Sequence, residues 1–184
     1  MIYFCIWKGT DSVGKVVMYS VPLPAILLIS LLVRAVTLPG FFDGWVLYIK
    51  PVWSSLKQPE VWTAAFSQIF YTLTLGFGIM ITYGSYKHED EDVVKDTWLT
   101  AIIDIGISLF AGSVIFGILG YMAYKTGIPV SELAASGPGL AFVVFPKALS
   151  LMPFASLFSV LFFIMLLSLA IDSAFSLVEA VNGA

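Results

Sequence analysis

The chain has 184 residues, of which 59% belong to the hydrophobic set and 11% are charged, and its mean hydropathy is +0.97. An ordinary soluble domain is nearer half apolar and a quarter charged, so this composition excludes a soluble enzyme and a disordered tail. Nine Lys and Arg against twelve Asp and Glu leave no basic excess for nucleic acid, and the single cysteine, Cys5, excludes an internal disulfide or a cysteine metal cluster. A membrane protein remains.

Four stretches are apolar over the length of about 20 residues that a helix needs to cross a bilayer. In chain order, the sequence predicts helical spans over 16–38, 61–86, 97–124 and 153–178. Strand-type alternation does not persist, and helices satisfy their own backbone groups in lipid, so we expect an all-α polytopic membrane protein. The lysines of the connectors divide almost evenly between the two sides, so charge alone does not orient the chain.

The first seven residues are apolar but too short to span a bilayer. They have neither the basic leader nor the small-residue cleavage site of a signal peptide. They look like the last turns of a helix whose beginning is absent. The chain is therefore either a small four-helix protein or a piece of a larger one.

The first span has a weak beginning. Gly14 and Pro24 bracket nine residues, and Pro22 precedes Pro24. Because proline lacks a backbone donor and disrupts a helix interior, we expect the first turns of this span to unwind easily. A plain proline kink is the alternative.

The second span contains a predicted break. Gln68 and Thr72 share a helix face, and two glycines, Gly76 and Gly78, then flank Phe77. Broken membrane helices expose backbone carbonyls and amides, which are tolerated where they line a cavity and bind ions or substrates. The alternative is close helix packing through small residues.

The third and fourth spans each carry one acid, Asp104 and Asp172. A carboxylate at the bilayer centre costs about 2.5–3.5 kcal/mol on insertion scales, so both acids are candidates for function. Ser108 lies one turn after Asp104, and a polar stripe runs through Ser168, Asp172 and Ser176, with Ser173 beside it. These hard oxygen donors suit a hard cation such as sodium. The alternative is that the serines only bond their own helix.

Several motifs in order now point to a family. They are "LLVRAVTLPG" (31–40), "QIFYTLTLGFG" (68–78), "YGSY" (83–86), "SGPGLAFVVFPKAL" (136–149) and Ile171-Asp172-Ser173. With these motifs the chain resembles the neurotransmitter:sodium symporters, and its sequence is more similar to the animal-type members than to the bacterial ones. The resemblance implies part of a LeuT-type fold, in which about ten of some twelve helices form two inverted repeats.

The resemblance also implies which part of that fold the chain is. It corresponds to the tail of helix four and to helices five to eight, a central fragment that lacks helices one to three and nine onwards. The connectors 8–15 and 87–96 are then cytoplasmic. The connectors 39–60 and 125–152 are extracellular, and the second forms a re-entrant helical hairpin.

Residue roles follow by matching positions. The first sodium site is implied at Thr72 and Asp104, and the second at the main-chain carbonyl of Leu169 with Asp172 and Ser173. The implied chloride positions are Gln68, Thr72, Asp104 and Ser108. The implied substrate positions are Tyr71, Thr72, Thr74, Gly76, Phe77, Gly78, Ala174 and Leu177. Tyr71 and Tyr86 match gate positions, and Gly14 and Pro24 match a hinge.

One departure from the family pattern concerns Asp104. Asparagine is usual at this position, so the acid adds a fixed negative charge that we expect to strengthen cation binding and reduce the need for chloride. The opposite possibility is that Asp104 carries a proton, since burial disfavours the charged form of a carboxyl group.

The resemblance implies a symporter, not an enzyme, that couples sodium, and chloride if Asp104 permits, to a small amino-acid or amine substrate by alternating access. It would be a multi-pass protein of the plasma membrane, with lipid and the remaining helices as partners. Thr74 favours a neutral amino acid. Because the absent first helix normally supplies half of both sodium sites, we expect no transport by these residues alone.

Two other functions stay open at this point. In an intramembrane aspartyl protease, Asp104 and Asp172 would share a proton across two helices. Neither acid lies in the Gly-x-Gly-Asp sequence expected there. The other possibility is a small non-transporting membrane subunit that associates with helices encoded elsewhere.

Overall fold

The structure is a computed structural model that describes residues 22–86, 92–133 and 137–182. Within these ranges the chain is helical and contains no strand, which confirms the all-α prediction. The predictions that involve Gly14 and the connector 8–15 lie outside the described residues. The helices are α3 (Pro22–Val36), α4 (Phe41–Ile49), the 3-10 helix η1 (Trp53–Lys57), α5 (Pro59–Thr72), α6 (Ile79–Ser85), α7 (Val93–Thr126), α8 (Val130–Leu133), the π-helix η2 (Leu140–Val144), α9 (Phe145–Ser150) and α10 (Ala155–Asn182).

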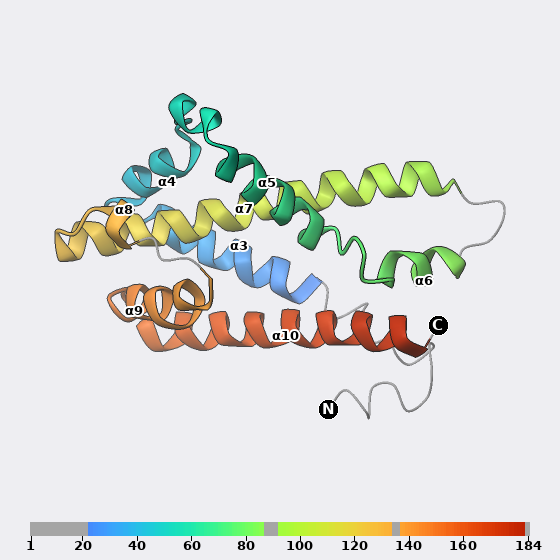
Figure 1. Cartoon of the computed structure of the whole chain (residues 1–184). Coiled ribbons are helices and arrows are strands. Elements are labelled where there is room, and N and C mark those ends of the chain that lie inside the picture. Colours follow the sequence, from blue (N-terminus) through green and yellow to red (C-terminus); the bar gives the residue numbers. More distant parts are fainter. Residues whose placement is uncertain (1–21, 87–91, 134–136, 183–184) are drawn as a thin grey trace. The chain divides into compact units, whose positions relative to one another are not determined.

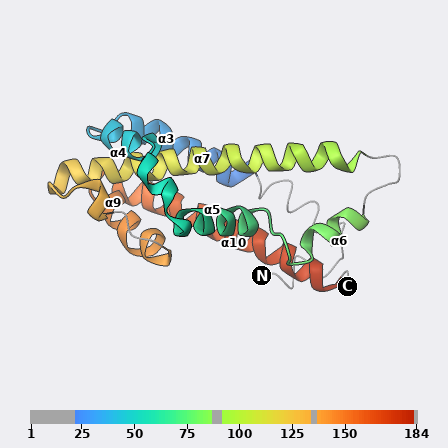
Figure 2. The ribbon, with the colours of Figure 1, turned by 45° about the horizontal axis from the view of Figure 1, so that its top comes forward.

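Two long helices, α7 and α10, dominate both views of the ribbon (Figure 1, Figure 2). Among the described residues, Val93–Thr126 and Ala155–Val178 are each long and apolar enough to cross a membrane. Helix α7 begins four residues before the predicted span because Asp92 caps it. The Asp92 carboxylate accepts hydrogen bonds from the backbone N–H groups of Val94 and Lys95, both at 3.1 Å. Asp92 therefore ends the polar connector and starts the helix.

The first predicted span is bent in its described part. The described part of helix α3 runs from Pro22 to Val36, and both Pro22 and Pro24 lie in it. Helix α3 and the helical segment Phe41–Lys57 form an apolar pair bent by 117°. Gly40, with φ of 83°, stands at the bend. The bend therefore lies at Pro39 and Gly40 and not at Pro22 or Pro24.

The second predicted span is divided into two helices, as its glycines predicted. Helix α5 has 14 residues and α6 has 7, and neither alone reaches the length of a membrane crossing. The six residues between them form the non-helical linker 73–78, which Figure 2 shows between α5 and α6.

The described residues belong to two compact units. One contains the described parts of Gly14–Lys50 and Leu109–Ala170, and its core is built from α3, α7, α9 and α10. Leu31, Val114 and Phe145 are almost completely buried there. The Tyr121 hydroxyl donates a hydrogen bond of 2.8 Å to the carbonyl of Leu151, which fixes the chain after α9 against α7.

Close backbone contacts hold α4 against α7 within the same unit. A Cβ atom added to Gly44 would overlap the carbonyl oxygen of Phe116 and would lie 2.9 Å from the Cα of Gly120. The ring of Phe41 occupies the corresponding space at Gly117. Small residues therefore allow the two helices to approach at backbone distance.

The other unit contains the described parts of Pro51–Ser108 and Ile171–Ala184. It holds α5, the linker 73–78, α6, the first half of α7 and the last turns of α10. This unit contains the broken helix and most of the polar residues singled out from the sequence.

Candidate ion and substrate site

The linker 73–78 is non-helical because three of its residues adopt the left-handed backbone conformation. Gly76 and Gly78 have φ of 81° and 79°, and Thr74 has φ of 53°. Glycine adopts this region without steric cost, and its use here ends one helix and allows the next to begin. Helix ends leave backbone carbonyls and amides without intrahelical partners, so the linker offers main-chain polar groups at the break.

Thr74 is the unusual residue of the linker. A β-branched residue at positive φ is a conformational outlier, and such strain is typically of order 1–3 kcal/mol. Its hydroxyl Oγ1 is buried, and among the described residues it has no hydrogen-bond partner. A strained residue with an unpaired buried hydroxyl at a helix break has the chemistry of a ligand contact.

Thr72 and Asp104, the two residues implied for the first sodium site, are in contact. The Thr72 hydroxyl donates a hydrogen bond of 3.2 Å to Oδ1 of Asp104, from the last residue of α5 to the first half of α7. The other carboxylate oxygen, Oδ2, is buried and has no hydrogen-bond partner within the described ranges. One carboxylate oxygen thus remains available beside the helix break, and it is a suitable ligand for a hard cation.

The remaining two residues of the implied chloride set are not brought into contact. Gln68 lies one turn before Thr72 and Ser108 one turn after Asp104, and both side chains are exposed. In the part of the chain that the structure describes, neither forms a hydrogen bond with Thr72 or Asp104. The geometry therefore joins the two residues shared by the sodium and chloride sets, and leaves the other two at its edge.

Tyr71, at the end of α5, packs against Phe77 of the linker. The rings of Tyr71 and Phe77 have centroids 5.9 Å apart, and Phe70 packs edge-on against Tyr71 at 6.1 Å. Tyr71 is 65% exposed, so this face of the linker is open in the described chain. Tyr86, the other predicted gate residue, follows the last turn of α6.

The residues implied for the second sodium site lie on one turn of α10. Asp172 is half-buried and Ser173 is exposed, and Leu169 precedes them by one turn. Ala174 and Leu177, the predicted pocket-wall positions, follow on the same helix. No group of three His, Cys, Asp or Glu side chains gathers within the described ranges.

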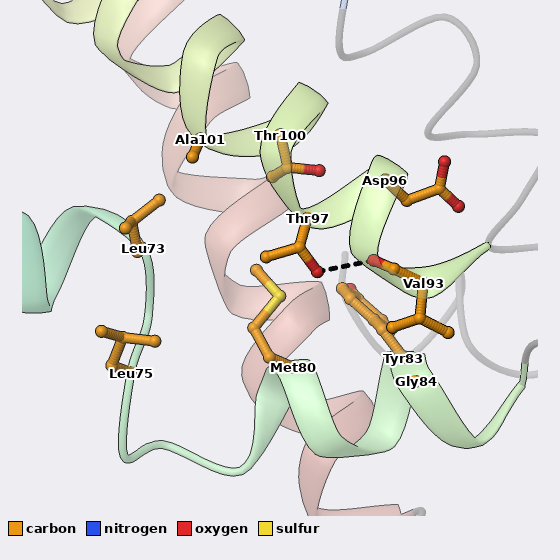
Figure 3. A pocket seen from close by; sticks show the side chains of 10 residues that line it. All are labelled: Leu73, Leu75, Met80, Tyr83, Gly84, Val93, Asp96, Thr97, Thr100 and Ala101. Carbon is orange, nitrogen blue, oxygen red and sulfur yellow. Dashed lines mark hydrogen bonds between the residues drawn. The ribbon is translucent and has the colours of Figure 1, made fainter.

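A cavity of about 490 Å³ lies between the linker, α6 and the start of α7 (Figure 3). Its walls are mostly apolar. The lining residues are Leu73, Leu75, Met80, Tyr83, Gly84, Val93, Asp96, Thr97, Thr100 and Ala101. Figure 3 shows that Leu73 and Leu75 reach it from the linker, and Met80 and Tyr83 from α6. None of the eight predicted substrate residues lines this cavity, although Leu73 and Leu75 of the same linker do.

Comparisons with known proteins decide the family. The profile of the sodium:neurotransmitter symporter family matches residues 1–184. The chain belongs to this family. It is 48% identical over 179 residues to the sodium- and chloride-dependent creatine transporter 1 of Oryctolagus cuniculus and of Homo sapiens. It is 45% identical over 179 residues to the sodium-dependent dopamine transporter of Caenorhabditis elegans.

The matches cover 97% of this symporter-family chain but only 28% of each creatine transporter and 29% of the dopamine transporter. The chain therefore spans less than a third of the length of these relatives. The family consists of solute transporters and not of enzymes. This finding removes the aspartyl protease alternative for Asp104 and Asp172, and confirms the resemblance drawn from the motifs.

The sequence did not predict one polar contact between helices α6 and α10. The Tyr83 hydroxyl of α6 donates a hydrogen bond of 2.9 Å to Oγ of Ser176 on α10. Both residues belonged to recognised patterns, since Tyr83 begins the "YGSY" motif and Ser176 ends the polar stripe. The stripe predicted that Ser176 faces the same side as Asp172, but it did not indicate a partner 93 residues away.

Proposed function

We propose that the chain supplies the ion- and substrate-binding centre of a sodium-coupled symporter for a small solute with a cationic nitrogen. The observation that carries this proposal is the hydrogen bond from Thr72 to Asp104 at the break between α5 and α6. It places a carboxylate, a hydroxyl and an unwound backbone together in an otherwise apolar chain. Such broken helices bind substrate and coupling ions in transporters with inverted repeats.

Sodium coupling is supported by oxygen ligands on three helices, α5, α7 and α10. Asp104 and Thr72 offer oxygens at the first candidate site, and Asp172, Ser173 and the Leu169 carbonyl offer oxygens at the second. The family membership and the names of the creatine relatives, which include sodium and chloride dependence, agree with this assignment. Asp104 supplies a charge of its own, so we propose that chloride contributes less here than in those relatives.

The proposal for the substrate class is supported by the names of the relatives and by Thr74. Creatine carries a guanidinium and a carboxylate, and dopamine carries an ammonium, so a positively charged nitrogen is common to both. The unpaired Thr74 hydroxyl favours a solute with a carboxylate as well, because a hydroxyl donor then gains a charged acceptor. We therefore propose a zwitterion, either a guanidino acid or a neutral amino acid.

Transport is proposed to proceed by alternating access in the plasma membrane. Sodium and substrate favour one conformation only to the extent that they bind it better than the other. In this chain, we propose that Asp104 beside the linker and Asp172 on α10 are the residues whose ion contacts differ between the two conformations. We propose that helices homologous to the rest of the longer relatives complete both ion sites, with lipid around them.

The test is a chimaera in which this chain replaces the aligned 179-residue segment of the human creatine transporter 1. We expect uptake of a labelled zwitterion that is lost when sodium is replaced by choline. Creatine, glycine, alanine and dopamine are compared as substrates, with the unmodified human transporter as the control for expression. Asp104→Ala should remove most sodium-dependent uptake while the protein still reaches the cell surface. Uptake that is equal in sodium and choline would contradict the proposal.

A further inference from the structure

The hydrogen bond between Tyr83 and Ser176 connects two parts of the candidate site that the chain keeps far apart. Tyr83 lies on α6, five residues after Gly78, where the broken helix begins again. Ser176 lies on α10, one turn after Asp172. Their hydroxyl groups are 2.9 Å apart, which is an ordinary hydrogen-bond distance.

The bond continues into the turn that carries the second ion site. The Ser176 hydroxyl accepts from Tyr83 and itself donates to the main-chain carbonyl of Asp172 at 3.3 Å. A hydroxyl that accepts one bond becomes a better donor for the next, so the two bonds support each other. The series runs from Tyr83 through Ser176 to the backbone of Asp172. A shift of the helical turn at Asp172 would therefore change the hydrogen bond that Tyr83 donates to Ser176.

Two features of helix α6 connect it to the candidate site. Its first end follows Gly78, whose φ of 79° makes the linker a point of rotation, and Tyr83 ties its second half to α10. Tyr83 also lines the cavity of about 490 Å³ (Figure 3). A rotation of the ring toward this space would break the bond to Ser176. A bond with two discrete arrangements is what coupling between sites requires.

We propose that Tyr83 is a positioning residue that, through Ser176, couples the second ion site on α10 to the linker that contacts substrate. This inference rests on the proposed function, since it assigns the ion of Asp172 and Ser173 to sodium. When the bond is made, α6 and the Asp172 turn move as one, and the linker keeps the conformation that goes with an occupied ion site. When the bond is lost, sodium must bind without this support, so its apparent affinity falls.

The test uses the chimaera described above, with the sodium concentration for half-maximal uptake as the readout. Tyr83→Phe removes one hydroxyl and leaves the ring, and Ser176→Ala removes the other. We expect each variant to raise the half-maximal sodium concentration about threefold to tenfold, the effect of one hydrogen bond. The double variant should be no worse than the poorer single variant, because both changes break the same bond.

Two control variants separate coupling from a loss of packing. Ser85→Ala removes a hydroxyl on α6 that bonds only within its own helix, at 2.7 Å to the Thr82 carbonyl. Ser176→Thr keeps a hydroxyl at the proposed position. Both should stay within about twofold of the parent in sodium dependence. A merely structural role for Tyr83 would lower the amount of protein at the cell surface and leave the half-maximal sodium concentration unchanged, which would overturn the inference.

A second readout separates this inference from the proposed function. The sodium-induced rise in melting temperature of the purified chimaera does not require transport. If the parent shows a sodium-dependent rise and Tyr83→Phe shows the same midpoint, the coupling is wrong and the proposed function stands. If the parent responds to sodium in neither assay, the proposed function is wrong and the coupling falls with it. Additive effects in the double variant would also overturn the coupling.

Discussion

The Thr72 hydroxyl donates a hydrogen bond of 3.2 Å to the Asp104 carboxylate and so connects the end of α5 to α7 across 32 residues of sequence. This contact leaves Oδ2 of Asp104 buried without a hydrogen-bond partner among the described residues. A buried acceptor without a partner is unfavourable unless a ligand completes it. The relationship makes Asp104 the residue whose charge should matter most for ion coupling.

We expect Asp104→Asn to make uptake by the chimaera depend more on chloride. A unit charge about 4 Å from a cation is worth about 4 kcal/mol at an effective dielectric constant of 20, and a third of this value is already about tenfold in affinity. With Asp104 present, replacing chloride by gluconate should leave most uptake intact. With asparagine, the same replacement should lower uptake about tenfold.

The matched control for this prediction is Asp43→Asn. Asp43 is an exposed acid in the first turn of α4, in the other unit of the chain. Its loss should leave the ratio of uptake in chloride and gluconate unchanged. If the parent chimaera loses all uptake in gluconate, the idea that Asp104 replaces part of the chloride requirement is refuted.

A second prediction concerns the backbone of the linker. Gly78→Ala should lower the free energy of unfolding by about 1–2 kcal/mol, because at a φ of 79° the Cβ atom of alanine comes too close to the neighbouring backbone carbonyl oxygen. Crowding is not the reason, since a Cβ atom at Gly78 would meet nothing within 4 Å. Gly106→Ala on α7, which also has open space, should be neutral or stabilising in a helix. Melting curves of the two purified variants test this, and equal melting temperatures would disprove the role of Gly78.

Much of this architecture could be predicted from local sequence. The paired glycines 76 and 78 predicted the helix break because their backbone freedom is a property of single residues. The apolar stretches predicted α7 and α10 because a membrane-spanning helix requires about 20 consecutive, mostly apolar residues, which can be read directly from the sequence. The apolar pattern predicts the start of α7 four residues too late, because the capping role of Asp92 depends on which backbone groups its carboxylate reaches.

The contacts between distant segments could not be read in the same way. The family resemblance indicated that Thr72 and Asp104 share a site, but their actual hydrogen bond depends on how α5 packs against α7. The bond from Tyr83 to Ser176 has no periodic signal at all, because each residue lies on a different helix. Helix periodicity places a residue on a face, and only packing decides what that face meets.

A third prediction tests how the chain after α9 is held to α7. Tyr121→Phe should destabilise the protein by about 1–3 kcal/mol, because the Leu151 carbonyl then loses its donor in a partly buried place. Tyr124→Phe makes the same chemical change at a residue that is 64% exposed, and should have little effect. Thermal unfolding in detergent, followed by tryptophan fluorescence, compares the two. A similar loss of stability in both variants would show that the Tyr121 bond contributes nothing specific.

A fourth prediction concerns the close approach of α4 and α7. Gly44→Ala should destabilise this unit by at least about 1–3 kcal/mol, since the added methyl group overlaps backbone atoms that cannot turn aside. Gly106→Ala again serves as the control for the change in residue type. The yield of monodisperse protein and its melting temperature are the measurements. Unchanged values for Gly44→Ala would mean that the two helices lie farther apart than the structure shows.

The last prediction concerns what these residues do without further helices. Tyr71 is 65% exposed, and Gln68 and Ser173 are exposed too, so the candidate site presents one open side to its surroundings. An ion at such a site keeps water as a competitor and gains few protein ligands. We therefore expect the purified 184-residue chain to show no sodium-stimulated binding of labelled creatine or neutral amino acids, whereas the purified chimaera binds one of them. Scintillation proximity binding in sodium and in choline makes the comparison. Saturable, sodium-dependent binding by the chain alone would refute the need for further helices.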